Sequence, residues 1–222
     1  MRKKGSPRSE PIFQEHPSGR SSNPVLSVKV VMIVTILEDS NNKPGKHKIK
    51  NDFWAQNGIE VIRQRLPVGD YALMNDKIRD VFARKEKRGI PVKMMDLLGT
   101  YDVVIDSKRD ILELVGDVCG EAHDRFRDEC ILAQNNGIRL IVLVENEDGI
   151  TDLRDLHSWV NPRLFIRKLG RQVYPKAVRG QTLMKACMTM EKKYGVKFLF
   201  CHPYEAGQRI LELLRGDEYG YS

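Results

Sequence analysis

The predicted fold is decided by the stretch 103–108, which reads Val-Val-Ile-Asp-Ser-Lys. Its three apolar, β-branched residues are typical of a buried strand. The Asp-x-Lys triplet that follows places an acid and a base two residues apart, and residues two apart in a strand face the same side of a sheet. We therefore expect Asp106 and Lys108 to project together at the point where a strand ends and a loop or helix begins.

Strands and helices alternate on both sides of this stretch. Strands are predicted over 28–37, 59–66, 70–74, 101–105, 138–144 and 196–201. Helices are predicted over 48–57, 110–118, 121–135, 151–159, 181–194 and 203–214. Residues 75–100 are expected to be an irregular insertion with one short helix, and 161–179 a basic loop. This order predicts an α/β fold with a mixed central sheet and helices on both faces.

Length and composition indicate a single folded domain. The chain has 222 residues, of which 41% are hydrophobic and 30% charged. Residues 1–26, rich in Pro, Ser, Gly and Arg, are predicted to be a flexible basic tail, 27–216 the domain, and 217–222 a C-terminal tail. No apolar run approaches the roughly 20 residues that cross a bilayer, so no membrane partner is expected. Four cysteines without a C-x-x-C pair predict free thiols in a reducing, cytoplasmic compartment.

Three aspartates at strand ends point to chemistry. Asp39 follows the first strand, Asp70 opens a later one, and Asp106 closes the next. If neighbouring strands bring them together, a hard divalent cation such as Mg²⁺ or Mn²⁺ would relieve their repulsion. Such an ion acidifies a water that attacks phosphorus, and Lys108 would orient or deprotonate this water or stabilise charge on the phosphate. The residues alone leave three alternatives: a metal nuclease, a structural charge cluster, or other phosphate chemistry.

Basic side chains predict a polyanionic partner such as a nucleic acid. The formal net charge is +7, and segment 161–179 contains six basic residues, two aromatic residues and no acid. The candidates for DNA binding are Arg125, Arg127, Arg163, Arg167, Lys168 and Arg171. The alternatives are a basic loop without a role and, for the two arginines of the helix over 121–135, a solvated face paired with neighbouring acids.

A family resemblance rests on three motifs in order. They read Ile-Leu-Glu-Asp-Ser at 36–40, Leu-Pro-Val-Gly-Asp-Tyr at 66–71 and Val-Ile-Asp-Ser-Lys at 104–108. Together they resemble the nuclease domain of the XPF-type (ERCC4-domain) endonucleases, in the PD-(D/E)XK, restriction-endonuclease-like superfamily. The resemblance covers about 28–214 and is greatest to short stand-alone bacterial members. It implies a restriction-endonuclease-like mixed sheet, with Asp39, Asp70 and Asp106 as metal ligands and Lys108 as the catalytic lysine.

The resemblance also implies an activity. It predicts a Mg²⁺- or Mn²⁺-dependent endonuclease in which Asp70, Asp106 and Lys108 act on branched, flapped or junction DNA, as a homodimer or with a partner subunit. One departure stands at the centre of the motif, because the family's usual Glu-Arg-Lys reads Asp106-Ser107-Lys108 here. This departure keeps open a non-catalytic DNA-binding or scaffold protein of the same fold, or a nuclease subunit that needs a partner.

Overall fold

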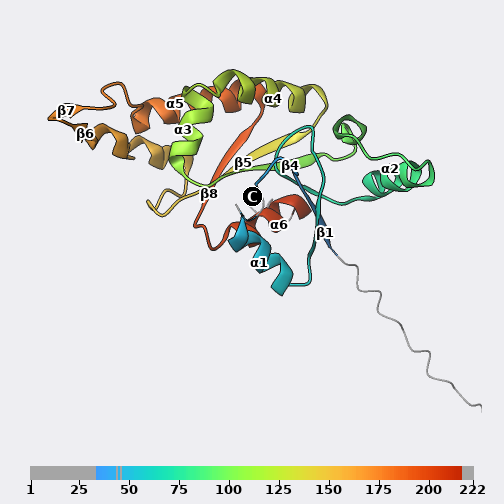
Figure 1. Ribbon diagram of the computed structural model, residues 1–222. Helices are drawn as coiled ribbons and strands as arrows, with labels where there is room; N and C mark the ends of the chain where they lie inside the picture. Colours follow the sequence, from blue (N-terminus) through green and yellow to red (C-terminus); the bar gives the residue numbers. More distant parts are fainter. Residues whose placement is uncertain (1–33, 44, 46, 217–222) are drawn as a thin grey trace, which may run out of the picture. The chain divides into compact units, whose positions relative to one another are not determined.

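A six-stranded mixed sheet forms the centre of the part of the chain that the computed structural model describes, residues 34–43, 45 and 47–216. The strand order is β2-β1-β3-β4-β5-β8 (Figure 1). The strands are β1 (Thr35–Glu38), β2 (Glu60–Arg63), β3 (Tyr71–Leu73), β4 (Val103–Lys108), β5 (Arg139–Glu145) and β8 (Lys197–Cys201). β3 runs antiparallel to β1 and β4, whereas β1–β2, β4–β5 and β5–β8 are parallel pairs. The predicted tails, 1–26 and 217–222, lie outside the described residues.

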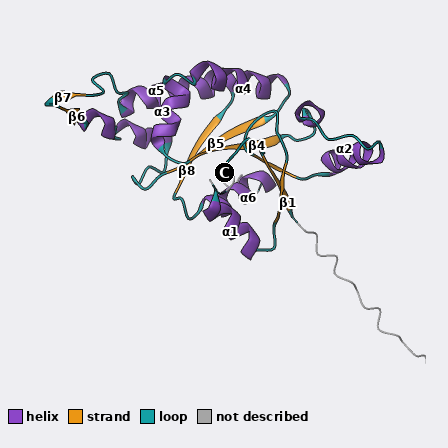
Figure 2. Cartoon of the chain, viewed as in Figure 1, coloured by secondary structure: helices purple, strands orange, loops and turns teal. Residues whose placement is uncertain are grey.

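Helices cover both faces of this sheet, as predicted (Figures 1 and 2). The first face packs on α3 (Ile111–Cys119), α4 (His123–Asn135) and α5 (Gly180–Tyr194), and the second on α1 (Lys48–Gln56) and α6 (Ala206–Arg215). Alternation along β4 explains the two cores, since Val104 packs in the first and Ile105 in the second. The expected α/β sheet is therefore confirmed.

Two helix ends that were predicted from capping residues in the sequence are confirmed. Asp110 Oδ1 accepts a 2.7 Å hydrogen bond from the backbone N–H of Glu113 and caps α3. α5 ends at Gly195, which has φ = 71° and so adopts the left-handed conformation that glycine reaches without strain. The four cysteines are all free, as expected.

The prediction for residues 75–100 is wrong in one respect, because they contain a regular twelve-residue helix, α2 (Asp76–Lys87), and a short 3₁₀ helix, η1 (Met94–Leu97). Asn75 caps α2 by accepting a 2.9 Å hydrogen bond from the Ile78 backbone N–H. Ile78 and Val81 form its buried stripe. The charged residues around these two apolar positions concealed the helical period.

Residues 161–179 are not simply a loop. A 3₁₀ helix, η3 (Pro162–Phe165), leads into a two-stranded hairpin of β6 (Arg167–Lys168) and β7 (Arg171–Gln172). Both strands are fully exposed, so no burial pattern marked them in the sequence. The helix predicted over 151–159 is a 3₁₀ helix, η2 (Leu153–His157).

Candidate active site

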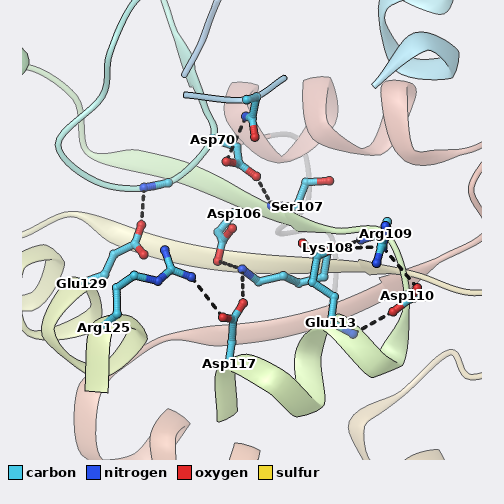
Figure 3. A network of polar contacts seen from close by, with 12 residues as sticks. Asp70, Asp106, Ser107, Lys108, Arg109, Asp110, Glu113, Asp117, Arg125 and Glu129 are labelled. Atoms are coloured by element: carbon cyan, nitrogen blue, oxygen red, sulfur yellow. Dashed lines mark hydrogen bonds and ion pairs between the residues drawn. The ribbon is translucent and has the colours of Figure 1, made fainter. Parts of the chain in front are cut away.

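Asp70 lies beside Asp106 because β3 pairs antiparallel with β4. The backbone N–H of Asp70 donates to the Ile105 carbonyl over 2.8 Å, and Asp70 Oδ2 accepts from the Ser107 N–H over 2.9 Å. Asp106 and Lys108 both lie within β4, which extends three residues beyond the predicted strand end. They share the face of Val104, toward α3 and α4, while Ser107 faces the other side. The structure thus brings together Asp70, Asp106 and Lys108 (Figure 3).

Lys108 is held between two carboxylates. Its Nζ lies 2.7 Å from Asp106 Oδ2 and 2.6 Å from Asp117 Oδ2, and 5.4 Å from the centre of the buried Phe126 ring. Burial alone would lower the pKa of Lys108, but Asp106 and Asp117 outweigh burial and raise it above its ordinary value. Lys108 is therefore a fixed ammonium group and holds its proton at physiological pH.

Asp106 is a buried carboxylate that lies near two other carboxylates, those of Asp70 and Asp117. It is 5% exposed, and burial raises its pKa to about 6, assisted by Asp70 and Asp117 and opposed by Lys108. Its Oδ2 is buried and has no partner in hydrogen-bond geometry, so the ion pair with Lys108 is its main compensation. A carboxylate oxygen of this kind is a ready ligand for a cation.

Two acids that the sequence did not single out complete this cluster. Asp117, on α3, pairs with Lys108 and accepts a 3.1 Å hydrogen bond from Arg125 Nη2. Glu129, on α4, accepts a 2.7 Å hydrogen bond from the Gly69 N–H, and burial followed by the charge of Asp106 raises its pKa. Figure 3 shows both on the Lys108 side of β4.

Gly69 is needed where the chain enters this site. Its φ is +69°, and a Cβ placed on it would lie 2.5 Å from Val104 Cγ2. Only glycine avoids both the left-handed strain and the clash. Gly69 therefore sets the position of the next residue, Asp70.

Asp39 stands at the same edge of the sheet with its carboxylate turned to the backbone. Its N–H donates to the Asp70 carbonyl over 2.7 Å. Its Oδ1 accepts from the N–H groups of Asn41, at 3.3 Å, and Leu66, at 3.2 Å. The structure places Asp39 next to Asp70 through the backbone, and these contacts orient its carboxylate.

A second polar cluster lies under the site, on the α1 and α6 side of the sheet. Ser107 Oγ donates a 3.0 Å hydrogen bond to Glu145 Oε1, and the same oxygen forms an ion pair with Lys50 Nζ. The Lys50 and Glu145 side chains are only 4% and 10% exposed. This buried pair anchors the segment of β4 that carries Asp106 and Lys108.

The donor chemistry of the site fits a hard divalent cation. Mg²⁺ is usually bound in proteins by one or two carboxylates, with waters and substrate phosphate oxygens as its other ligands. Asp70 and Asp106 supply two such carboxylates, and the buried Asp106 Oδ2 is matched only by its ion pair with Lys108. Within the described ranges, no three His, Cys, Asp or Glu side chains gather closely enough to form a metal site on their own.

Comparison with known proteins gives the family. The family model of the ERCC4 domain matches residues 39–214 of this chain. The chain belongs to the ERCC4-domain family. It is an XPF-type nuclease domain, and the matched range contains Asp39, Asp70, Asp106 and Lys108.

A solved structure is also similar to the ERCC4 domain described here. XPF from Aeropyrum pernix is 14% identical, with a TM-score of 0.48, over 84% of this chain and 66% of that one. This chain therefore spans just under two thirds of that protein's length. Among curated proteins, none is found that matches this chain.

The predicted DNA-binding residues of the ERCC4 domain fall in two places. Arg125 and Arg127 lie on α4, where Arg125 pairs with Asp117 beside the site and Arg127 contacts Asp124 and Asp128 at 2.8 and 2.9 Å. The others lie farther along the chain, with Arg163 on η3 and Arg167, Lys168 and Arg171 on the β6–β7 hairpin. Among the described helices, none combines the length and apolar character needed to span a membrane.

Proposed function

We propose that this ERCC4 domain is a Mg²⁺- or Mn²⁺-dependent endonuclease that hydrolyses phosphodiester bonds in DNA. The observation that carries the proposal is the pairing of β3 with β4, which places Asp70 next to Asp106, with Lys108 on the face of β4 that carries Asp106. Asp70 and Asp106 would hold the metal, and Asp39 would join them by turning its carboxylate away from the N–H groups of Asn41 and Leu66. When bound, the ion would supply a water of lowered pKa and neutralise phosphate charge.

Lys108 has a different role from that of a base. The carboxylates of Asp106 and Asp117 keep it protonated, so it would not deprotonate the attacking water. A fixed ammonium group stabilises negative charge that develops on a phosphate during hydrolysis. Asp117 would hold Lys108 in position for this task, because it lies 2.6 Å from Nζ on the side opposite the strand.

The substrate is proposed to be branched, flapped or junction DNA. The support is membership of the ERCC4-domain family and the position of the basic residues: Arg125 contacts Asp117 at the site, and its side chain is 69% exposed. Arg127 would have to leave two carboxylates to reach a phosphate, so we assign it the smaller contribution. A homodimer or a partner subunit would supply further DNA contacts.

A second candidate is a DNA-binding protein that does not cut. One observation favours it: Ser107, which replaces the arginine of the usual motif, points away from the site and hydrogen-bonds Glu145. Arg109 does not replace that arginine, because its exposed side chain pairs with Asp110 and Glu113 (Figure 3).

Cleavage of labelled DNA separates the two candidates. The substrates are a flap, a fork, a nicked duplex, an intact duplex and a single strand, each with Mg²⁺, Mn²⁺ or chelator. We expect metal-dependent cutting of at least one branched substrate, and a loss of about 10²-fold or more in Asp106→Asn and Lys108→Met. Asp102→Asn, at an exposed position just before β4, is the matched control and should cut normally. DNA binding without cleavage of any substrate would leave the non-catalytic candidate.

A further inference from the structure

The tip of the β6–β7 hairpin carries a leucine that the fold does not use. Leu169 and Gly170 form the two-residue turn between the paired residues Lys168 and Arg171. Leu169 is 95% exposed, so packing within the domain contributes almost nothing at this position. The hairpin projects from the domain beyond α3 and α5 (Figure 1).

The backbone makes leucine an unfavourable choice here. The φ angles of Leu169 and Gly170 are 51° and 78°, as in the turns that favour Asn-Gly or Gly-Gly. Among the residues the structure describes, Leu169 is the only one other than glycine with positive φ. A strained, exposed apolar residue that does not stabilise the fold indicates a role in binding.

The surroundings of Leu169 specify the chemistry of its partner. Lys168 and Arg171 are opposite each other on the two strands, where like charges repel. The six basic residues of segment 161–179 face no acid within that segment, and none of them forms an ion pair with another described residue. Phe165 and Tyr174, 71% and 44% exposed, flank the base of the hairpin. Cations around exposed apolar and aromatic groups fit a polyanion with accessible bases.

A cavity lies beside the base of the hairpin, against α3. It has a volume of about 790 Å³, and its lining includes Asp117 of α3 together with Arg163, Tyr174 and Lys176. Arg163 lies over the Tyr174 ring, 5.7 Å from its centre. Asp117 also contacts Lys108, so one residue of α3 borders both this cavity and the candidate active site.

We propose that Leu169 is a wedge that enters the base stack of bound DNA and makes the enzyme prefer branched or interrupted duplexes. This inference rests on the proposed function and names a residue that determines its specificity. Apolar side chains flanked by basic residues open a base step at a cost in stacking energy. The cost is lowest where stacking is already interrupted, so the wedge favours junctions over continuous duplex.

The test compares Leu169→Asn with Leu169→Met, which keeps an apolar tip. Asparagine adopts positive φ easily, so we expect both variants to fold with unchanged or higher melting temperature. The probe is a three-way junction with 2-aminopurine beside the branch, bound in the presence of chelator so that cleavage plays no part. Wild type and Leu169→Met should raise the fluorescence of 2-aminopurine as it unstacks, and Leu169→Asn should lose this rise. The Leu169→Asn substitution should also weaken binding to the junction about 10-fold to 100-fold. It should leave binding to the duplex, and the salt dependence of that binding, unchanged.

An equal fluorescence rise in the Leu169→Asn variant would overturn the wedge, whatever the cleavage assay shows. A wedge signal without cleavage would refute the proposed nuclease activity and leave the wedge standing. Loss of a wild-type dimer in Leu169→Asn, detected by light scattering without any change in 2-aminopurine, would assign the tip to protein contact and also overturn the proposal.

Discussion

Replacing Asp106 by asparagine should change how the stability of the metal-free domain depends on pH. Asp106 has a pKa of about 6 in the fold, against about 3.9 in an unfolded chain. This difference of about two units corresponds to about 3 kcal/mol. The folded state binds the proton more tightly, so the associated stability is fully present below about pH 4 and is lost as the pH rises through about 6.

Urea unfolding of both proteins in chelator, at intervals from pH 4 to pH 7.5, measures this effect. The free energy of unfolding of wild type minus that of Asp106→Asn should fall by about 2 kcal/mol across the range, because part of the effect lies below pH 4. Asp102→Asn corrects for the removal of a surface charge. Mg²⁺ should restore most of the lost stability to wild type and none to Asp106→Asn, because a bound cation favours the ionised carboxylate. If the difference between the two free energies of unfolding stays constant with pH, then burial and the neighbouring carboxylates do not raise the pKa of Asp106.

Two further substitutions test the framework of the site. Gly69→Ala should cost about 1–3 kcal/mol more than Gly99→Ala in thermal or urea unfolding, because both positions have positive φ but only the first meets a side chain; equal costs would contradict the close packing. Lys50→Ala should cost about 3–5 kcal/mol by leaving the buried Glu145 carboxylate unpaired, whereas Lys48→Ala, which breaks an exposed pair on the same helix, should cost at most about 0.5 kcal/mol. A loss below about 1 kcal/mol for Lys50→Ala would show that water reaches Glu145.

The sequence was sufficient for features that depend on short-range patterns. The apolar run of β5 and the cap at Asp110 each act through neighbours in the chain, so their signals are local. The same is true of the strand alternation that places Asp106 and Lys108 on one face. The hairpin at 167–172 was missed for the complementary reason, because its strands bury nothing and leave no period.

Asp117 and Glu129 were missed because helix packing alone brings them to β4. A weak signal existed in both cases. Asp117 follows Leu114 by three residues on the buried face of α3, and Glu129 follows Phe126 by three residues on α4. An acid aligned with core positions of a helix marks a buried charge that needs a partner. The identity of that partner, Lys108 for Asp117 and Gly69 for Glu129, is tertiary information.

The carboxylate of Asp70 also acts as a substitute for main chain. β3 and β4 share the single residue pair Tyr71–Ile105, and beyond it Asp70 Oδ2, rather than a peptide carbonyl, accepts the Ser107 N–H. Truncating this side chain would remove one hydrogen bond between β3 and β4 as well as a charge, so the loss of activity in an alanine variant could have either cause. Asp70→Asn keeps a side-chain oxygen that can accept the Ser107 N–H. This variant can therefore distinguish the loss of a metal ligand from the loss of a hydrogen bond between the strands.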